Sequence, residues 1–148
     1  MSAEVQMRMT ADDEQQHVTE LVIIDDDPAF STMLKDYLYS SGKMLAELFS
    51  SGEQFIKTYS PQDNRTIILD YHFGKESNLT GIDILKRIRA INMSANVIVV
   101  SSQDSLEIAV ENMRRGACDY FIKNTQTVFV NILSSLQKIR TMLQHKMN

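Results

Sequence analysis

Residues 66–69 form a short apolar run that ends at the carboxylate of Asp70. The run is rich in β-branched side chains and lacks polar alternation, which predicts a strand buried on both faces. Strands of that kind belong to parallel sheets covered by helices, so this segment favours an α/β fold. Ligands of open α/β sheets bind beyond the carboxyl ends of the strands. Asp70 is therefore the first candidate for a functional residue.

Three other apolar runs also end in polar residues. The runs and the residues that follow them are 21–24 with Asp25, Asp26 and Asp27; 97–100 with Ser101 and Ser102; and 120–122 with Lys123. If these strands are parallel neighbours, their polar ends meet at one edge of the sheet. The sequence thus predicts a crevice lined by carboxylates, hydroxyl groups and one amine.

Helical patterns separate the predicted strands. Asp27 and Pro28 suit the N-cap and the first position of a helix, and Ile84, Leu85 and Ile88 form one buried helical stripe. The expected strands are 21–24, 44–49, 66–70, 97–100 and 120–122, and the expected helices are 28–40, 51–59, 81–91, 105–115 and 127–144. These alternations predict one three-layer α/β/α domain over residues 20–146.

Charge and composition narrow the function. The formal net charge of −4 gives no basic footprint for nucleic acid or for an anionic membrane. Residues 1–19 lack the apolar core of a signal peptide and are expected to be a disordered leader. The single cysteine, Cys118, cannot form an internal disulfide and is expected to be a small buried residue. Lys138, Arg140 and Lys146 are expected on the solvent face of the last helix. A cytoplasmic protein without direct nucleic-acid or membrane contact is predicted.

The predicted crevice suits formation of a phosphoryl-aspartate. Phosphoryl transfer passes through a charge-spread transition state, so a site must mainly position groups and neutralise charge. Asp25 and Asp26 would hold a hard divalent cation, while Lys123 and the Ser101 hydroxyl would contact phosphoryl oxygens. Two carboxylates about 4 Å apart repel by about 4 kcal/mol at an effective dielectric near 20. A cation or a raised pKa must therefore relieve the acidic cluster around Asp70.

The order of these segments resembles the receiver domain of response regulators in two-component signal transduction. The matching stretches are residues 22–28, 67–70, 97–101 and 116–123, and the similarity runs from about residue 21 to 143. The resemblance implies a flavodoxin-like, doubly wound fold with a five-stranded parallel sheet in the order 2-1-3-4-5. It also implies a single-domain regulator of the chemotaxis or phosphorelay type.

The resemblance implies roles for the acidic residues. Asp70 matches the phospho-acceptor, a residue that becomes phosphorylated in this family. Asp25, Asp26 and Asp70, together with the main-chain carbonyl of His72, match the ligands of Mg²⁺. The His72 side chain itself is expected to be partly exposed, at a position that in this family tunes loss of the phosphoryl group.

The resemblance also implies roles for the other crevice residues. Ser101, the backbone N–H of Ser102 and Lys123 match the phosphate-binding groups. Ser101 and Tyr120 match the switch pair, and Gln103 occupies a second tuning position. The phosphoryl donor would be a sensor histidine kinase or a histidine phosphotransferase. A downstream protein would bind the surface made by residues 105–115, 120–122 and 127–144, and a homodimer is left open.

This chain departs from the family pattern at three places. Phe73 and Gly74 replace the usual Met-Pro, and Gly81 arrives later after Asp70 than is typical. Asn124 stands where a proline commonly follows the lysine through a cis bond. A cis bond before a residue other than proline costs about 2.5–4 kcal/mol, so a trans Lys123–Asn124 peptide is expected.

Two alternatives to a phosphorylated switch stay open. A degenerate receiver would serve only as a dimerisation module. An aspartate-nucleophile phosphatase of the haloacid dehalogenase type would use Asp25, although Asp26 and Pro28 do not fit its spacing and the chain has no cap-sized insertion. In the favoured interpretation, a phosphorylated receiver, the domain speeds only its own phosphoryl uptake and loss, so it is expected to be a switch and not an enzyme.

Overall fold

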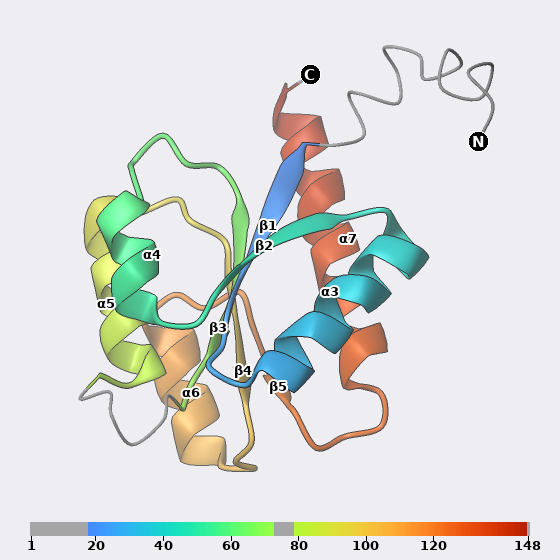
Figure 1. Ribbon diagram of the computed structural model, residues 1–148. Helices are drawn as coiled ribbons and strands as arrows, with labels where there is room; N and C mark the ends of the chain where they lie inside the picture. Colours follow the sequence, from blue (N-terminus) through green and yellow to red (C-terminus); the bar gives the residue numbers. More distant parts are fainter. Residues whose placement is uncertain (1–17, 73–78, 148) are drawn as a thin grey trace, which may run out of the picture.

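The computed structural model describes residues 18–72 and 79–147 of the chain. Its elements are β1 (Thr19–Ile24), α3 (Pro28–Gly42), β2 (Leu45–Phe49), α4 (Gly52–Thr58), β3 (Thr66–Asp70), α5 (Gly81–Ile91), β4 (Val97–Ser101), α6 (Leu106–Arg114), β5 (Asp119–Ile122) and α7 (Val128–Met147). Among the described residues, five strands form one parallel sheet in the order β2-β1-β3-β4-β5 (Figure 1). The predicted flavodoxin-like fold and strand order are confirmed.

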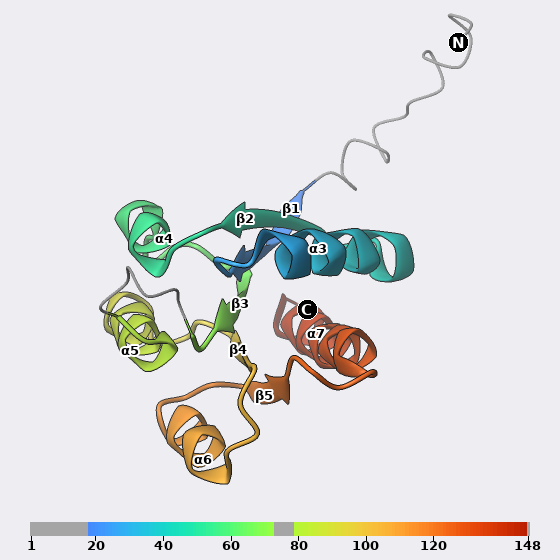
Figure 2. The same cartoon turned by 60° about the horizontal axis from the view of Figure 1, so that its bottom comes forward.

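Helices cover both faces of the sheet. α3 and α7 lie on one face, and α4, α5 and α6 lie on the other (Figure 1, Figure 2). Successive strand residues point to opposite faces. Ile23 therefore packs beneath α3 and α7, whereas Val22 and Ile24 pack toward α4 and α5. Because both faces are covered, β3 and β4 are buried along their whole length, which explains why their sequences are so apolar.

The element boundaries agree with the predicted ones to within three residues. Asp27 caps α3 as expected, since its side chain accepts hydrogen bonds from two backbone N–H groups of the first turn, and Pro28 follows it. The far end of α3 differs from the expectation. The helix continues to Gly42, and Lys43 adopts the left-handed conformation with a φ of 54°. A lysine thus takes the position that glycine usually fills at the end of a helix.

Two side chains lie elsewhere than predicted. Cys118, expected to be buried, is exposed in the loop before β5. Arg140, expected on the solvent face of α7, pairs instead with the carboxylate of Glu20 and lies 3.4 Å from the carbonyl oxygen of Gly42. Arg140 therefore ties α7 to the start of β1 and to the end of α3. Helical periodicity does not reveal this contact, because it assigns a face of the helix and not a partner.

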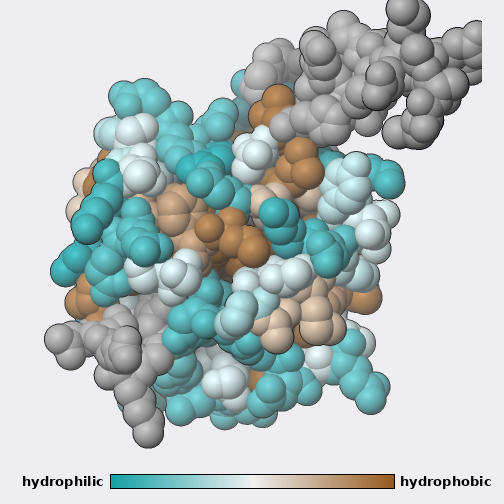
Figure 3. Space-filling view, in the orientation of Figure 1, coloured by the Kyte–Doolittle hydropathy of each residue, from teal (hydrophilic) through white to brown (hydrophobic). Residues whose placement is uncertain are grey.

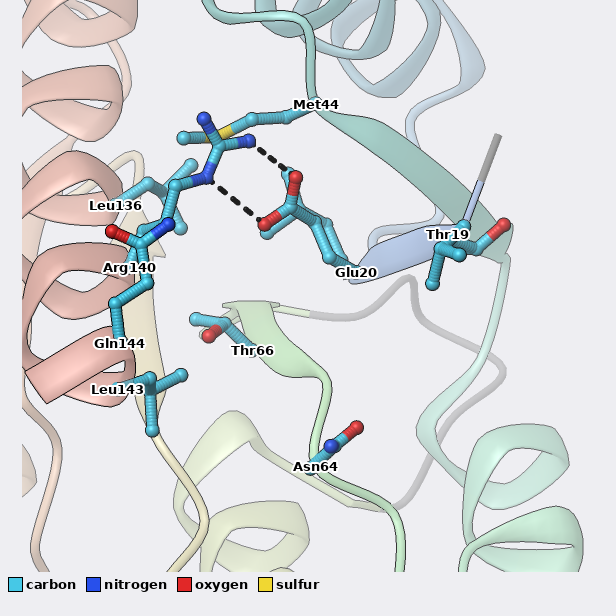
Figure 4. A pocket seen from close by; sticks show the side chains of 11 residues that line it. Thr19, Glu20, Met44, Asn64, Thr66, Leu136, Arg140, Leu143 and Gln144 are labelled. Atoms are coloured by element: carbon cyan, nitrogen blue, oxygen red, sulfur yellow. Dashed lines mark hydrogen bonds and ion pairs between the residues drawn. The ribbon is translucent and has the colours of Figure 1, made fainter. Parts of the chain in front are cut away.

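The ion pair of Arg140 stands beside a hollow between α7 and the amino ends of β1 and β3 (Figure 4). Met44, Leu136 and Leu143 supply apolar lining, and Thr66 marks the first residue of β3 there. This hollow lies at the end of the sheet opposite Asp70. None of the predicted site residues lines it.

The face of the molecule in Figure 3 is mostly hydrophilic, with apolar side chains gathered near its centre, where β2 crosses in Figure 1. β2 is an edge strand, and its Leu48 is 36% exposed. Among the helices of residues 18–72 and 79–147, none has the length and apolar character needed to cross a membrane. The predicted leader lies outside the described residues up to residue 17, and Thr19 already belongs to β1.

Gly81 fixes how α5 follows the end of β3. Its N–H donates a hydrogen bond of 2.8 Å to the carbonyl oxygen of Tyr71. A Cβ atom at this position would lie 2.6 Å from Cα of Tyr71 and 2.8 Å from the carbonyl oxygen of Asp70. Both of these neighbours are backbone atoms, so the clash has no flexible side chain to relieve it.

We therefore expect Gly81→Ala to lower the free energy of unfolding by about 1–3 kcal/mol, measured by urea denaturation, because overpacking against backbone forces a shift. Gly42→Ala is the matched control. Its new Cβ would meet only the end of a flexible side chain, Cδ1 of Leu133, at 2.6 Å. If Gly81→Ala lost no more stability than Gly42→Ala, this account of the α5 junction would be wrong.

Candidate functional site

Three carboxylates converge at the carboxyl ends of β1 and β3. The two strands pair in parallel with Ile24 beside Leu69, so the residues that follow them come together. One oxygen from each of Asp25, Asp26 and Asp70 lies within 4.8 Å of the others. Asp25 and Asp70 are only 5% and 4% exposed, whereas Asp26 is exposed. The structure thus brings together the three acids that the sequence singled out.

Backbone hydrogen bonds orient the two buried carboxylates. Oδ1 of Asp25 accepts a hydrogen bond of 2.8 Å from the N–H of Asp27. Oδ1 of Asp70 accepts one of 3.3 Å from the N–H of His72. Each contact reaches two residues ahead, where the chain turns away from the sheet. In both carboxylates the other oxygen, Oδ2, faces a positively charged side chain.

That charged group is the amine of Lys123, which follows β5. Its Nζ lies 2.7 Å from Oδ2 of Asp25 and 3.5 Å from Oδ2 of Asp70. The side chain is only 12% exposed. Lys123 therefore stands between two buried carboxylates that reach it from β1 and β3. The predicted convergence of acids and an amine at one sheet edge is present.

The electrostatics of the cluster are unfavourable to its fully charged form. Burial, followed by the charge of Asp25, raises the pKa of Asp70 to about 7. Burial also raises the pKa of Asp25, although its hydrogen bond with Lys123 opposes that rise. Burial disfavours the charged amine of Lys123, but the hydrogen bond to Asp25 and the charge of Asp70 outweigh it and raise the pKa of Lys123. One ammonium does not fully neutralise this site.

Ser101 is the last residue of β4 and Ser102 follows it, beside the same edge. Ser101 is fully buried, and its hydroxyl oxygen accepts a hydrogen bond of 3.1 Å from the N–H of Gln103. Its carbonyl oxygen accepts one of 2.8 Å from the N–H of Lys123. Ser102 is exposed, and its carbonyl oxygen accepts a 3.4 Å hydrogen bond from Nδ2 of Asn124. The loops after β4 and β5 are thus joined, and the Lys123–Asn124 peptide is trans, as predicted.

Tyr120 is connected to Ser101 through the backbone of one residue. The Tyr120 hydroxyl donates a hydrogen bond of 3.1 Å to the carbonyl oxygen of Gln103, whose N–H donates to the Ser101 hydroxyl. Tyr120 itself is half-buried. The two residues predicted to form a switch pair are therefore linked, although their side chains do not hydrogen-bond to each other.

His72 and its loop are described only in part. The His72 side chain is half-buried and packs edge-on against the ring of Tyr71, with centroids 4.7 Å apart. Phe73 and Gly74, which replace the family's Met-Pro, lie outside the described residues. The description of the loop resumes at residue 79, shortly before Gly81.

The donor set fits a hard divalent cation. Carboxylate oxygens are the ligands that Mg²⁺ prefers, and Asp25, Asp26 and Asp70 offer three of them close together. Burial raises the pKa of both Asp25 and Asp70 and thereby disfavours their charged forms. A bound cation would relieve both carboxylates.

The chain was compared with known proteins. The family model described as the response regulator receiver domain matches residues 21–133. The chain belongs to the response regulator receiver family. Receiver domains generally accept a phosphoryl group from histidine kinases and act on downstream effectors, bind Mg²⁺ in an acidic pocket, and are not classical enzymes.

Individual relatives agree with this assignment. The transcriptional regulatory protein ZraR of Escherichia coli strain K12 is 31% identical over 119 residues, which cover 80% of this chain and 26% of ZraR. This chain thus spans about a quarter of the length of that relative. The chemotaxis protein CheY of Thermotoga maritima is 28% identical over 119 residues, covering 80% of this chain and 95% of CheY.

A solved structure supports the fold. The receiver domain protein (CheY-like) of Methanospirillum hungatei has a TM-score of 0.70 and 20% identity, covering 88% of this chain and 99% of that chain. The likeness extends over almost the whole of the other receiver. The layered architecture described above is therefore the receiver fold.

One residue of this receiver's site was missed by the sequence reasoning. The ring of Phe30 lies beneath Lys123, with Nζ 4.5 Å from the ring centroid. In the sequence, Phe30 shares the apolar face of the helix after Pro28 with Leu34 and Leu38, and this position indicates only a core residue. A signal was present, because Phe30 lies in the first turn of the helix that Asp27 caps, directly after the acidic residues of the site.

The receiver's stability should depend on the protonation of Asp70. The pKa of Asp70 in the folded protein is about 7, above the ordinary value of 3.8. Between about pH 4 and pH 7, Asp70 is therefore protonated in the folded protein but ionised in the unfolded chain. That stabilisation is complete below about pH 4 and is lost as the pH rises through 7. Asp70→Asn is neutral throughout and escapes the loss.

We expect Asp70→Asn to become more stable than the wild type as the pH rises from 5 to 8, by on the order of 2–4 kcal/mol. Urea unfolding in the presence of EDTA measures the difference. Asp26→Asn is the control, because the Asp26 carboxylate is exposed. The difference in unfolding free energy between this variant and the wild type should change less with pH. A gap for Asp70→Asn that stays constant across this range would contradict the unfavourable charge at Asp70.

Proposed function

We propose that this receiver is a phospho-accepting switch. Asp70 takes a phosphoryl group from the phosphohistidine of a sensor histidine kinase or a histidine phosphotransferase. Mg²⁺ would be held by Asp25, Asp26 and Asp70 with the main-chain carbonyl of His72. The observation that carries the proposal is the amine of Lys123, which lies 2.7 Å from Asp25 and 3.5 Å from Asp70 at the carboxyl edge of the sheet.

The chemistry follows from these positions. An oxygen of Asp70 forms the new O–P bond while the P–N bond of the phosphohistidine breaks, and the imidazole nitrogen keeps the electron pair and takes up a proton. When bound, Mg²⁺ supplies positive charge against the phosphoryl oxygens. Lys123 supplies a second positive charge. The Ser101 hydroxyl and the backbone N–H of Ser102 donate hydrogen bonds to the remaining oxygens.

Loss of the phosphoryl group resets the switch. Water attacks phosphorus, the bond between phosphorus and the Asp70 oxygen breaks, and inorganic phosphate leaves. His72 and Gln103 flank this reaction as tuning residues. Both steps occur on the domain itself, so the protein has no separate substrate to turn over.

The free thiol of Cys118 suits a reducing compartment, and the proposal includes a cytoplasmic location without direct nucleic-acid or membrane contact.

Phosphorylation would be read by Ser101 and Tyr120. A phosphoryl group adds about −1.5 to −2 charge, and it attracts the Ser101 hydroxyl. Any movement of Ser101 strains its hydrogen bond from Gln103, whose carbonyl holds the Tyr120 hydroxyl at 3.1 Å. The surface formed by α6, β5 and α7 lies around Tyr120 and would bind the downstream protein.

Labelling with acetyl phosphate and Mg²⁺ tests the acceptor. We expect one covalent phosphoryl group on Asp70, located by peptide mass spectrometry, and none in Asp70→Asn. A label on Asp25 would favour the hydrolase alternative. Failure to label, together with no binding of beryllofluoride in a Mg²⁺ titration, would favour a degenerate receiver.

In His72→Ala, the lifetime of the label should change more than its rate of formation, and an unaltered half-life would remove His72 from the tuning role.

The outer face of α6 offers a contact for a second copy of the chain. Leu106, Val110 and Met113 are 80%, 40% and 46% exposed and fall on one side of the helix. Glu107 and Arg114 are both exposed next to this stripe. Two α6 helices packed antiparallel about Val110 would bury the stripe and set each Glu107 beside the partner copy's arginine at position 114. We propose that the homodimer, which the sequence left open, forms through this contact.

Charge reversal tests the homodimer. Glu107→Arg and Arg114→Glu should each weaken self-association by about tenfold, because two symmetric attractions become repulsions. The double variant should regain the affinity of the wild type. Sedimentation velocity over a concentration series gives the dissociation constants. A double variant as weak as the single ones would exclude this pairing.

A further inference from the structure

Lys123 has a third neighbour besides its two carboxylates. The ammonium that lies 2.7 Å from Asp25 and 3.5 Å from Asp70 also lies 4.5 Å from the centroid of the Phe30 ring. A cation within about 6 Å of an aromatic centroid is attracted by the negative face of the ring, and the attraction grows as water is excluded. Because the Lys123 side chain is only 12% exposed, water screens this contact little.

The Phe30 ring is itself held in place by other aromatic rings. It packs edge-on against Phe129 of α7, with centroids 5.6 Å apart and an interplanar angle of 63°. Phe129 also packs against Tyr37 of α3, with centroids 5.5 Å apart. The orientation of the Phe30 ring is therefore set by the packing of α3 against α7, and not by the site.

From this geometry we infer that Phe30 is a positioning residue for Lys123. Its ring holds the Lys123 ammonium close to the first turn of α3. From there the amine reaches Asp25 on one side and, on another, the place that an anion on Asp70 would occupy. Nothing in the acidic triad requires an aromatic residue at this position. The inference concerns the placement of Lys123 itself, and it rests on the proposed function only for the consequence in anion binding.

A ring suits this role better than a polar side chain would. An ammonium has three N–H donors and no acceptor. A carbonyl or carboxylate at position 30 would take one donor in a strong hydrogen bond and draw the amine away from Asp70. A ring face attracts the positive charge without a strong acceptor atom. The donors of Lys123 therefore stay available for Asp25 and for an oxygen bound to Asp70.

Ring-current shifts in proton NMR test the placement without metal or phosphoryl group. In the wild type, the Cε protons of Lys123, assigned with Lys123→Met, should appear upfield of those of the other lysines because they lie near the Phe30 ring. Phe30→Leu keeps an apolar side chain but removes the ring, so the upfield shift should be lost. Phe30→Tyr keeps an aromatic ring at this half-buried position and should retain the upfield shift.

Tyr37→Leu is the matched control. It removes a ring that packs on Phe129 and has no ring contact with Lys123 in the described residues. This variant should lose packing as Phe30→Leu does, yet keep the upfield shift. Equal loss of the shift in Tyr37→Leu and Phe30→Leu would overturn the inference, because general loosening of α3 against α7 would then explain the result.

Beryllofluoride affinity in the presence of Mg²⁺ tests the consequence. We expect Phe30→Leu to weaken binding by about three- to tenfold, Phe30→Tyr to restore it, and Tyr37→Leu to leave it unchanged. Unchanged affinity in Phe30→Leu would refute the positioning role even if the shift is lost. If the wild type itself binds no beryllofluoride, the proposed function fails, and the NMR result alone decides whether the ring holds Lys123.

Discussion

One buried amine makes the acidic end of this sheet tolerable. The parallel pairing of β1 and β3 puts Asp25 and Asp70 side by side, and both carboxylates are buried. Lys123 supplies the positive charge that offsets their repulsion. Lys123 can reach them only because β5 ends at the same edge as β1 and β3, two strands away from β3 in the sheet. The strand order and the register of the fold are thus the conditions for the site.

Much of this arrangement could be predicted from the sequence. Fully buried parallel strands must be apolar on both faces, so residues 67–69 and 97–100 stand out as strands, and the next polar residue marks the sheet edge. Parallel strands end on the same side, so Asp25, Asp70 and Lys123 are predicted to converge if their strands are close neighbours in the sheet. The order of the strands came from the resemblance, because an apolar run does not identify its neighbour. The roles of the individual site residues remain predictions.

Other features could not be predicted because they depend on contacts between distant segments. The pairing of Arg140 with Glu20 joins residues 120 positions apart, and helical periodicity is silent about it. The exposure of Cys118 is set by the path of the loop before β5. The sequence places Phe30 near the site but does not show that its ring contacts Lys123, for a different reason. A residue that packs in the core with one side of its ring can meet a charge with the other, and a helical stripe records only the first.

This chain lacks one feature of the family pattern beside Lys123. Where receivers commonly have a proline after the lysine, Asn124 follows Lys123 through a trans peptide. The Asn124 side chain donates to the carbonyl oxygen of Ser102, and the N–H of Lys123 donates to that of Ser101. Two hydrogen bonds thus hold the residues after β5 against the last residue of β4 and the residue that follows it.

Lys123 lies at unequal distances from Asp25 and Asp70, and this difference helps to explain why Asp70 is the reactive acid in the proposed function. Lys123 is closer to Asp25 than to Asp70, so Asp70 retains more of the unfavourable charge, and burial raises its pKa to about 7. A carboxylate that is poorly compensated in the free protein gains most when a cation binds beside it. The repulsion among the three converging acids is therefore offset in the cation complex and remains when no cation is bound. An evenly shared lysine would lower this difference, and with it the driving force for binding at Asp70.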